Sequence, residues 1–404
     1  MLKPKIIRAC TVSQSLAFVK GMIPDLVQKY DVALLSSPGP FWSELGDMCQ
    51  KVRCIEIEMV RQISPFRDLK SLWKIWRTFR KEKPQMVHSM TPKAGLLCML
   101  AAWLAQVPVR VHTFTGLVFP TATGMTKRIL IITDWLTCVC ATHIIPEGEG
   151  VKRDLLSNAI TKKPIKVLGY GNCQGIDLNH YDPMLKYDIV EEERMSNNKS
   201  KINQIHHEEI WRNSYNSTIK PVKYNNVVTF ISIGRMVRDK GINELIEAFI
   251  RLFGEEQNIR LILLGHTEEE RDPLCQKTLD AIEKHPNIEA VGYQSDVRPW
   301  LMVSNVSILA SYREGFPNVV IEAGAMGIPQ IVTDINGANE IIIEGKNGTI
   351  IPSHNVDALY DAMKRMLSKE YRESLAINAR EMVASRYDQH YVRQCLYEFY
   401  DSIL

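Results

Sequence analysis

Short apolar runs alternate with longer helical segments along most of this chain. The runs are rich in Ile, Leu and Val, and the segments between them repeat apolar residues with a helical period. Such alternation is typical of βαβ units, which build a parallel sheet with helices on both faces. The sequence therefore predicts a doubly wound α/β fold, with a helix over residues 16–29 between the first two runs. The runs expected to be strands are residues 5–10, 31–35, 52–58, 85–90, 109–114, 227–233, 260–264, 288–291 and 306–310.

Length and composition fit two globular domains. A chain of 404 residues is long enough for two cores, and its 45% apolar and 24% charged content is that of a soluble protein. The longest apolar stretch, 95–105, is shorter than the roughly 20 residues needed to span a bilayer, and the first residues do not resemble a signal peptide. We therefore expect a cytoplasmic protein.

The nine cysteines have no regular spacing. An odd number without metal-ligand spacing favours reduced thiols over a disulfide framework or a metal site. We therefore expect no metal centre.

Charge is distributed unevenly between the two halves. Residues 1–180 carry 24 Lys and Arg against 13 Asp and Glu, whereas residues 181–404 carry 25 against 33. A basic first half suggests an anionic partner, either a phosphorylated acceptor or an acidic membrane surface. The alternative is an uneven spread of solvated charge.

The segment 65–83 is a helix candidate in which Trp73 and Trp76 lie among many Lys and Arg. A basic amphipathic helix with tryptophan can rest on anionic lipid. Alternatively, the aromatic stripe packs on the sheet and the cations face water. We therefore keep contact with the inner membrane surface as a hypothesis.

The stretch 311–334, SYREGFPNVVIEAGAMGIPQIVTD, predicts a turn followed by a helix. Gly315 and Phe316 are expected at the start of the helix, where free N–H groups and the helix dipole attract an anion. Glu314 precedes the helix, and Glu322 lies on it, where it could accept hydrogen bonds from a sugar diol. The alternative is that Glu314 caps the helix and Glu322 is an ordinary exposed residue.

A second candidate loop follows the run 227–233. Gly234 allows a sharp turn, and Arg235 and Lys240 place two cations above the end of a strand. Two cations there could hold a diphosphate, although such residues are often only surface charges. The loop after the first run lacks GxGxxG, which argues against a nicotinamide or flavin site.

Polar residues also follow two of the first-half strands. Ligands bind at the carboxyl ends of parallel strands. We therefore expect these residues to line the mouth of a cleft, although a histidine in such a place is often structural. They are His88, Thr91, Lys93, His112 and Thr115.

The pair Glu314 and Glu322, with seven residues between them, resembles the motif of retaining glycosyltransferases of family four. The sequence EGFPNVVIEAGAMGIPQIVTD follows that family almost continuously, and residues 84–116 resemble its bacterial members that build capsular and other surface polysaccharides. The resemblance implies the GT-B fold, in which two Rossmann-like domains face each other across a cleft. It implies an acceptor domain at 1–180, a donor domain at 181–386 with a polar insertion at 187–226, and a last helix at 387–404 that crosses back.

The implied reaction is retaining transfer from a nucleoside-diphosphate sugar, with UDP-hexose or UDP-N-acetylhexosamine favoured. The expected acceptor is a saccharide, carried on a lipid such as undecaprenyl diphosphate, and no metal, cofactor or nucleic acid is expected. Arg235, Lys240 and Glu314 take the catalytic roles. Many family members have His-Gly where this chain has Thr115-Gly116, which leaves His112 as the nearest substitute. The implied donor-binding residues are Gly234, Gly315, Phe316, Pro317, Asn318, Glu322, His112 and Thr115.

Two other functions stay open on sequence grounds. A sugar-nucleotide 2-epimerase could use the same scaffold, and it would need acid and base groups in the first domain. A non-catalytic protein could use the tryptophan-rich helix to sit on a membrane.

Overall fold

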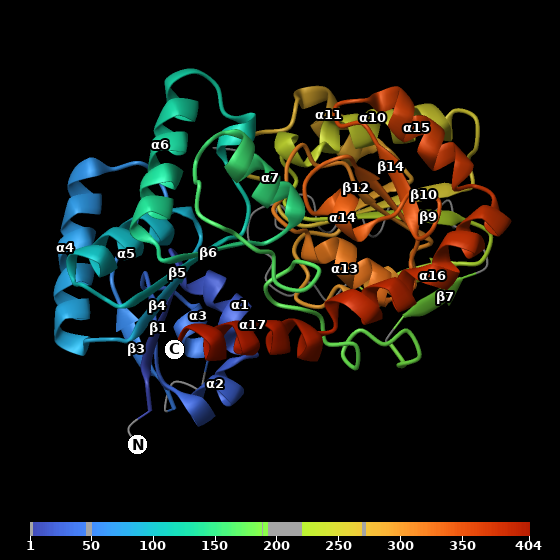
Figure 1. The fold of residues 1–404 in the computed structure, drawn as a ribbon. Helices are drawn as coiled ribbons and strands as arrows, with labels where there is room; N and C mark the ends of the chain where they lie inside the picture. Colours follow the sequence, from blue (N-terminus) through green and yellow to red (C-terminus); the bar gives the residue numbers. More distant parts are fainter. Residues whose placement is uncertain (1–2, 46–50, 188, 193–219, 269–271) are drawn as a thin grey trace. The chain divides into compact units, whose positions relative to one another are not determined.

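The computed structural model describes residues 3–45, 51–187, 189–192, 220–268 and 272–404 (Figure 1). Contacts divide it into two compact units: unit 1 is Met1–Gly175 with Gln389–Leu404, and unit 2 is Ile176–Asp388. The domain boundaries expected from the sequence were after residue 180 and before residue 387, and the structure has them after Gly175 and after Asp388. Most of the expected insertion 187–226 lies outside the described residues.

Unit 1 is built on a six-stranded parallel sheet in the order β3-β2-β1-β4-β5-β6. The strands are β1 Lys5–Ala9, β2 Asp31–Ser36, β3 Arg53–Glu56, β4 Met86–Met90, β5 Val109–Phe114 and β6 His143–Pro146. The helices are α1 Ala17–Lys20, α2 Ile23–Lys29, α3 Phe41–Glu44, α4 Pro65–Glu82, α5 Pro92–Leu104, α6 Gly124–Cys140, α7 Glu149–Ser157 and α17 Gln389–Ile403.

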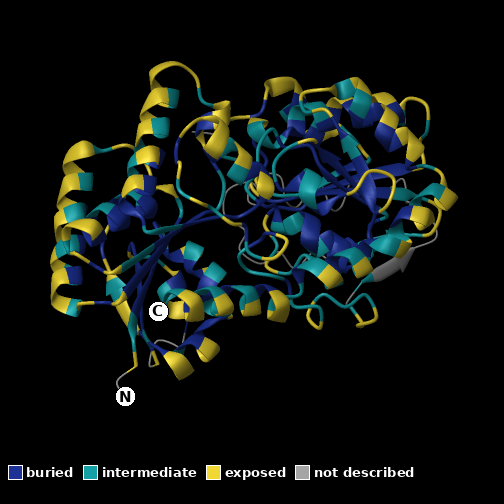
Figure 2. Ribbon diagram, in the orientation of Figure 1, coloured by how far each residue is buried: buried dark blue, intermediate teal, exposed yellow. Residues whose placement is uncertain are grey.

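Alternation of side chains along the strands gives unit 1 its two cores. Ile7 and Ala9 of β1 join a core with α4, α5 and α6, whereas Ile6 joins a core with α2 and α17 on the opposite face. Because successive strand residues point to opposite faces, both faces of the sheet are apolar and both are covered. Figure 2 shows the sheet buried beneath helices whose outer sides are exposed.

Unit 2 repeats this architecture with the parallel order β11-β10-β9-β12-β13-β14. The strands are β9 Val228–Ile233, β10 Ile259–Leu264, β11 Ile288–Ala290, β12 Val306–Leu309, β13 Gln330–Thr333 and β14 Gly348–Ile351, and a separate parallel pair is β7 Val190–Glu192 with β8 Val222–Tyr224. The helices are α10 Ile242–Phe253, α11 Gln276–Lys284, α12 Arg298–Met302, α13 Asn318–Ala325, α14 Ala338–Ile341, α15 Val356–Arg365 and α16 Lys369–Tyr387.

The doubly wound prediction is thus confirmed in both units. In each six-stranded sheet the order reverses beside the first strand of that sheet, between β1 and β4 and between β9 and β12. Ligands of such sheets bind outside the carboxyl ends of the strands at this reversal. In unit 2 the loops there begin at Gly234 and Ala310, and they carry the cations and Glu314 that the sequence selected.

One predicted helix is broken. Residues 16–29 were expected to be continuous, but the chain forms a 3₁₀ turn, Ser13–Leu16, then α1 and α2. Gly21 has low helix propensity, and Pro24 has no N–H to donate, so Pro24 is tolerated only in a first helical turn. A Cβ on Gly21 would lie 2.3 Å from Nη2 of Arg393, so the guanidinium of this α17 residue would have to move to admit a larger residue.

A buried polar chain holds α17 on the sheet of unit 1. Nη1 of Arg8 donates to the Tyr400 hydroxyl at 2.9 Å, and that hydroxyl lies 2.5 Å from Nδ1 of His88. Nε2 of His88 lies 2.7 Å from Oγ1 of Thr113. Burial lowers the pKa of His88 well below its usual value, so the ring is neutral. The contacts are all satisfied when the Tyr400 hydroxyl donates a hydrogen bond to Nδ1 and the Nε2–H group donates to Thr113.

None of the helices in the described part of the chain combines the length and the hydrophobicity that a bilayer-spanning segment needs.

We predict that Tyr400→Phe lowers the free energy of unfolding by about 2 kcal/mol, because Arg8 and His88 lose a buried partner. Tyr397→Phe is the control, since its hydroxyl bonds Asp25 at the surface, and we expect a loss below about 1 kcal/mol. Urea unfolding followed by circular dichroism measures both. Equal losses would show that the buried chain does not fix α17.

Candidate functional site

Glycines bring the loops of the candidate site in unit 2 together. Gly265 has φ +146°, and a Cβ there would lie 1.8 Å from the carbonyl oxygen of Gly234. Gly241 has φ +67°, and a Cβ on it would lie 2.1 Å from the carbonyl oxygen of Ala310. Only glycine fits such approaches and such backbone angles without strain. The 3₁₀ turn Arg238–Lys240 is thereby pressed against the end of β12.

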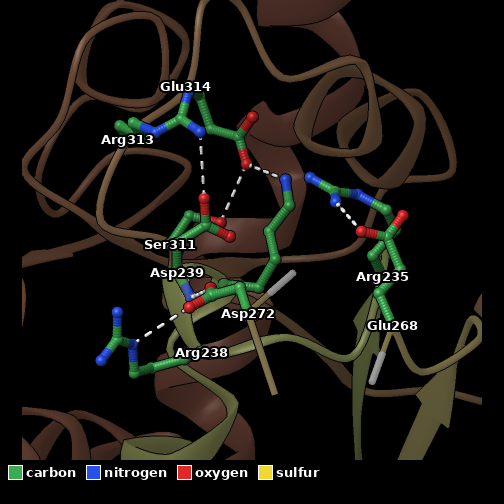
Figure 3. Close-up of polar contacts among 9 residues, drawn as sticks. Arg235, Arg238, Asp239, Glu268, Asp272, Ser311, Arg313 and Glu314 are labelled. Atoms are coloured by element: carbon green, nitrogen blue, oxygen red, sulfur yellow. Dashed lines mark hydrogen bonds and ion pairs between the residues drawn. The ribbon is translucent and has the colours of Figure 1, made fainter. Parts of the chain in front are cut away.

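The ammonium group of Lys240 forms an ion pair with Oε1 of Glu314, and both side chains are largely buried. The same oxygen accepts a hydrogen bond of 2.8 Å from the hydroxyl of Ser311, which is fully buried (Figure 3). The carbonyl oxygen of Ser311 in turn accepts a bond of 2.5 Å from Thr333. The carboxylate predicted to contact a donor sugar is therefore fixed in position beside a cation.

Each cation of this cluster is paired with a carboxylate. The Arg235 guanidinium lies 2.8 Å from Glu268, and the backbone N–H of Asp239 donates to Asp272 at 2.6 Å (Figure 3). Charge in the cluster is therefore balanced before any ligand binds, and an anionic ligand has to compete for the cations. The four pairs are Arg235–Glu268, Arg238–Asp272, Lys240–Glu314 and Arg313–Asp239.

The start of the helix after Glu314 differs from the prediction. Gly315 and Phe316 were expected at its N-terminus, but α13 begins at Asn318, with Pro317 as the N-cap. A residue before proline is driven away from the helical conformation, so Phe316 cannot join the helix. Its side chain is buried against Tyr387, and only its backbone can contact a ligand. Asn318 and Pro317 therefore lie nearer the helix tip than Gly315 and Phe316.

Glu322 lies in α13, and its carboxyl group is largely withdrawn from water. Burial raises the pKa of Glu322 to about 7, and a hydrogen bond from the Tyr181 hydroxyl acts in the opposite direction. Arg380 holds the segment that carries Tyr181, because its guanidinium donates to the carbonyl oxygens of Leu178, at 3.0 Å, and of Tyr181, at 2.5 Å. Glu322 is therefore a carboxyl group whose pKa lies near neutral pH, and it is not an exposed helix residue.

No sequence pattern pointed to a role for Tyr181 or Glu268. Tyr181 comes from the segment directly after the division between the units, and Glu268 follows β10. The position of Glu268 could have indicated its place in the site. It follows β10, which neighbours β9, and the ends of neighbouring parallel strands meet at one edge of the sheet.

His112 is a structural residue of unit 1. Its ring is 1% exposed, with Nδ1 2.8 Å from the hydroxyl of Ser89, and burial lowers the pKa of His112 to about 3. A Cβ on Gly95 would lie 2.4 Å from the ring, so the helix α5 packs directly on it. The prediction that His112 contacts a donor sugar is not supported by this placement, because no ring atom is open to a ligand.

The other unit 1 candidates also have partners in the fold. Thr91 shares a hydrogen bond of 2.7 Å with Thr11, and Lys93 pairs with Asp68 at 2.5 Å. Thr115 follows β5 and is half-buried, so it stays a candidate. In the part of the chain that the structure describes, no three His, Cys, Asp or Glu side chains are grouped as metal ligands.

Comparison with known proteins gives matches to both units. Residues 216–382 match the family model for glycosyl transferases group 1, and residues 26–171 match the model for a glycosyl transferase 4-like domain. The capsular polysaccharide biosynthesis glycosyltransferase CapM of Staphylococcus aureus is 31% identical over all of this chain and 98% of its own length.

An Escherichia coli enzyme, UDP-Gal:alpha-D-GlcNAc-diphosphoundecaprenol alpha-1,3-galactosyltransferase, is 25% identical over 89% of this chain and 86% of its own length. Among solved structures, Anabaena HepE in complex with UDP superposes with a TM-score of 0.72 at 16% identity, covering 98% of this chain and all of that one. At that identity the likeness concerns the fold, which is the GT-B fold.

Proposed function

The chain belongs to the group 1 glycosyl transferases, and from this membership we propose that it transfers a hexose or N-acetylhexosamine from a UDP-sugar to a lipid-linked saccharide. The proposed pathway is the assembly of a capsular or other surface polysaccharide, in keeping with the names of the relatives from S. aureus and E. coli. Undecaprenyl diphosphate is the proposed carrier of the acceptor. The proposed place of action is the cytoplasmic face of the membrane.

The observation that carries the proposal is the pair of Lys240 and Glu314, with Arg235 on the same loop after β9, where the strand order of unit 2 reverses. A diphosphate there would take the guanidinium and the ammonium as partners. The tip of α13, at Pro317 and Asn318, adds the positive end of a helix dipole.

Departure of the diphosphate is the difficult step. The bond between the anomeric carbon and a β-phosphate oxygen breaks, and negative charge grows on that oxygen. Arg235 and Lys240 would stabilise the growing charge, as donors held in place before the reaction do. No metal ion is part of this proposal, because the two cations take that role.

Retention follows when the acceptor hydroxyl attacks from the face that the diphosphate leaves. The hydroxyl oxygen forms the new bond to the anomeric carbon, and its proton passes to the departing phosphate oxygen. The protein then needs no general base of its own. Glu314 would orient the donor by accepting hydrogen bonds from sugar hydroxyls, and Glu322 would accept those of the ribose.

The present ion pairs suggest how the site responds to a donor. When a donor binds, the ammonium of Lys240 can turn to the diphosphate. Glu314 then accepts hydrogen bonds from sugar hydroxyls instead of pairing with Lys240. The bond from Ser311 keeps the Glu314 carboxylate in position during this exchange. Before a donor binds, the charges of Lys240 and Glu314 therefore balance each other. After it binds, groups of the donor take over as the partner of each.

We predict that Arg235→Ala lowers kcat by about 100-fold, because the leaving group loses one preorganised donor. The measurement is UDP release that depends on added acceptor. Arg251→Ala is the control: this arginine of α10 is half exposed and paired with Asp357 at 2.6 Å, and its loss should change kcat less than about twofold.

An unchanged kcat in Arg235→Ala would remove the assigned role of the cation. UDP release with no added acceptor, or interconversion of the donor sugar, would contradict transfer itself, and the second result would indicate the epimerase.

We predict that the KM for the UDP-sugar falls as pH rises from about 6 to about 8. With a pKa of about 7, Glu322 is protonated at the lower pH and accepts fewer hydrogen bonds from the ribose. Glu322→Gln should raise KM about tenfold and abolish the pH dependence. Steady-state kinetics at saturating acceptor measure both effects. The same slope of KM against pH in wild type and variant would show that another group titrates.

A further inference from the structure

Helix α6 of unit 1 is apolar on its exposed side as well as on its packed side. Leu130, Ile131 and Leu136 pack against the core of unit 1. Five further apolar side chains face water along the helix, with Ile132 59% and Trp135 48% exposed. The exposed set is Met125, Ile129, Ile132, Trp135 and Val139.

Charge is nearly absent from the exposed side of α6. Lys127 and Arg128 lie in its first turns, and its one acidic residue, Asp134, is buried. A surface helix of a soluble protein ordinarily has a polar outer face, and a helix that is apolar all round is buried in a core or a membrane. We therefore expect an apolar partner to cover the outer face of α6.

Helix α4 presents a second apolar stripe, and this one is surrounded by cations. Phe66, Leu69 and Trp73 follow helical spacing and are more than half exposed, with Phe66 at 91%. The exposed basic residues of the helix are Arg67, Lys70, Lys74, Arg77, Arg80 and Lys81.

The acidic residues of α4 do not offset these cations. Asp68 pairs with Lys93 of α5, and Glu82 pairs with Lys5 and with Arg53. The guanidinium of Arg77 lies 5.4 Å from the ring centre of Trp73, so cation and aromatic are presented together. The outer face of α4 is therefore aromatic and strongly positive.

The two stripes belong to one face of unit 1. Helices α4, α5 and α6 cover the same side of its sheet, with α5 packed against both of the others (Figure 1). The last turn of α5 adds Trp103 and Leu104, both about half exposed. Figure 2 shows the outer sides of α4 and α6 as exposed surface.

We propose that this face, formed by α4, the end of α5 and α6, docks on an anionic lipid bilayer. The apolar stripe of α6 and the aromatic residues of α4 enter the boundary between headgroups and acyl chains. The cations of α4 meet the lipid phosphates. Apolar and tryptophan side chains beside Lys and Arg are the combination that holds a helix in such an interface.

Charge favours lipid over a second copy of the chain as the occupant. Two copies joined through this face would bring the cations of α4 together, and like charges at a contact oppose association. An anionic bilayer attracts the same cations, and the attraction reaches about one Debye length from the surface. The inference rests on exposed side chains alone, so it does not depend on the proposed sugar transfer.

The experiment is sedimentation of the full-length protein with vesicles made of equal parts phosphatidylglycerol and phosphatidylcholine. Wild type should sediment with these vesicles, and it should bind less to phosphatidylcholine alone and less at high salt. The double variant Ile132→Ser with Trp135→Ser should bind at least about tenfold more weakly, because two apolar side chains no longer enter the lipid. Lys70→Glu with Lys74→Glu should weaken binding and flatten its salt dependence.

Ile377→Ser is the matched control, since Ile377 is 78% exposed on α16 of unit 2 and lies outside the proposed face. It should bind vesicles as wild type does. Unchanged circular dichroism and urea midpoints in all variants show that folding is intact. Failure of wild type to sediment, or equal binding by wild type and the α6 variant, would overturn the proposal. So would a dimer in solution that the α6 variant converts to a monomer.

Discussion

The ion pair between Lys240 and Glu314 is the contact on which the candidate donor site depends. It joins the loop after β9 to the loop after β12, the two strands between which the order of the sheet reverses. Gly241 makes the pair possible, because only a residue without a side chain lets the turn approach Ala310. A cation and a carboxylate are thereby held side by side at the edge where such sheets bind ligands.

Position along one short stretch gives the two glutamates of the site different properties. Glu314 lies in a loop and is balanced by Lys240 and Ser311. Glu322 lies within α13, where burial and not a cation determines its protonation. The first carboxylate thus has a cation as its partner, and the second, with a pKa of about 7, is only partly ionised near neutral pH. In the proposed reaction Glu314 orients the sugar, and Glu322 accepts hydrogen bonds from the ribose.

The alternation of strands and helices was enough to predict both parallel sheets, and the residues around Glu314 were enough to predict the family. Local exceptions in the chain were harder to predict. Pro317 delays the start of α13, and Gly21 and Pro24 break the helix expected over 16–29.

Burial is a property of tertiary packing, so the sequence alone could not show that His112 lies inside unit 1 or that Tyr181 reaches Glu322. For the same reason the exposed apolar side of α6 could not be predicted. Its apolar residues fit a packed helix, and only the structure shows which of them face water.

The most direct test of the donor site is a crystal structure of the protein with UDP. We expect the diphosphate within hydrogen-bonding distance of Arg235 and Lys240, and the ribose hydroxyls within hydrogen-bonding distance of Glu322. A nucleotide bound away from Glu322, with Lys240 still paired to Glu314, would contradict this expectation.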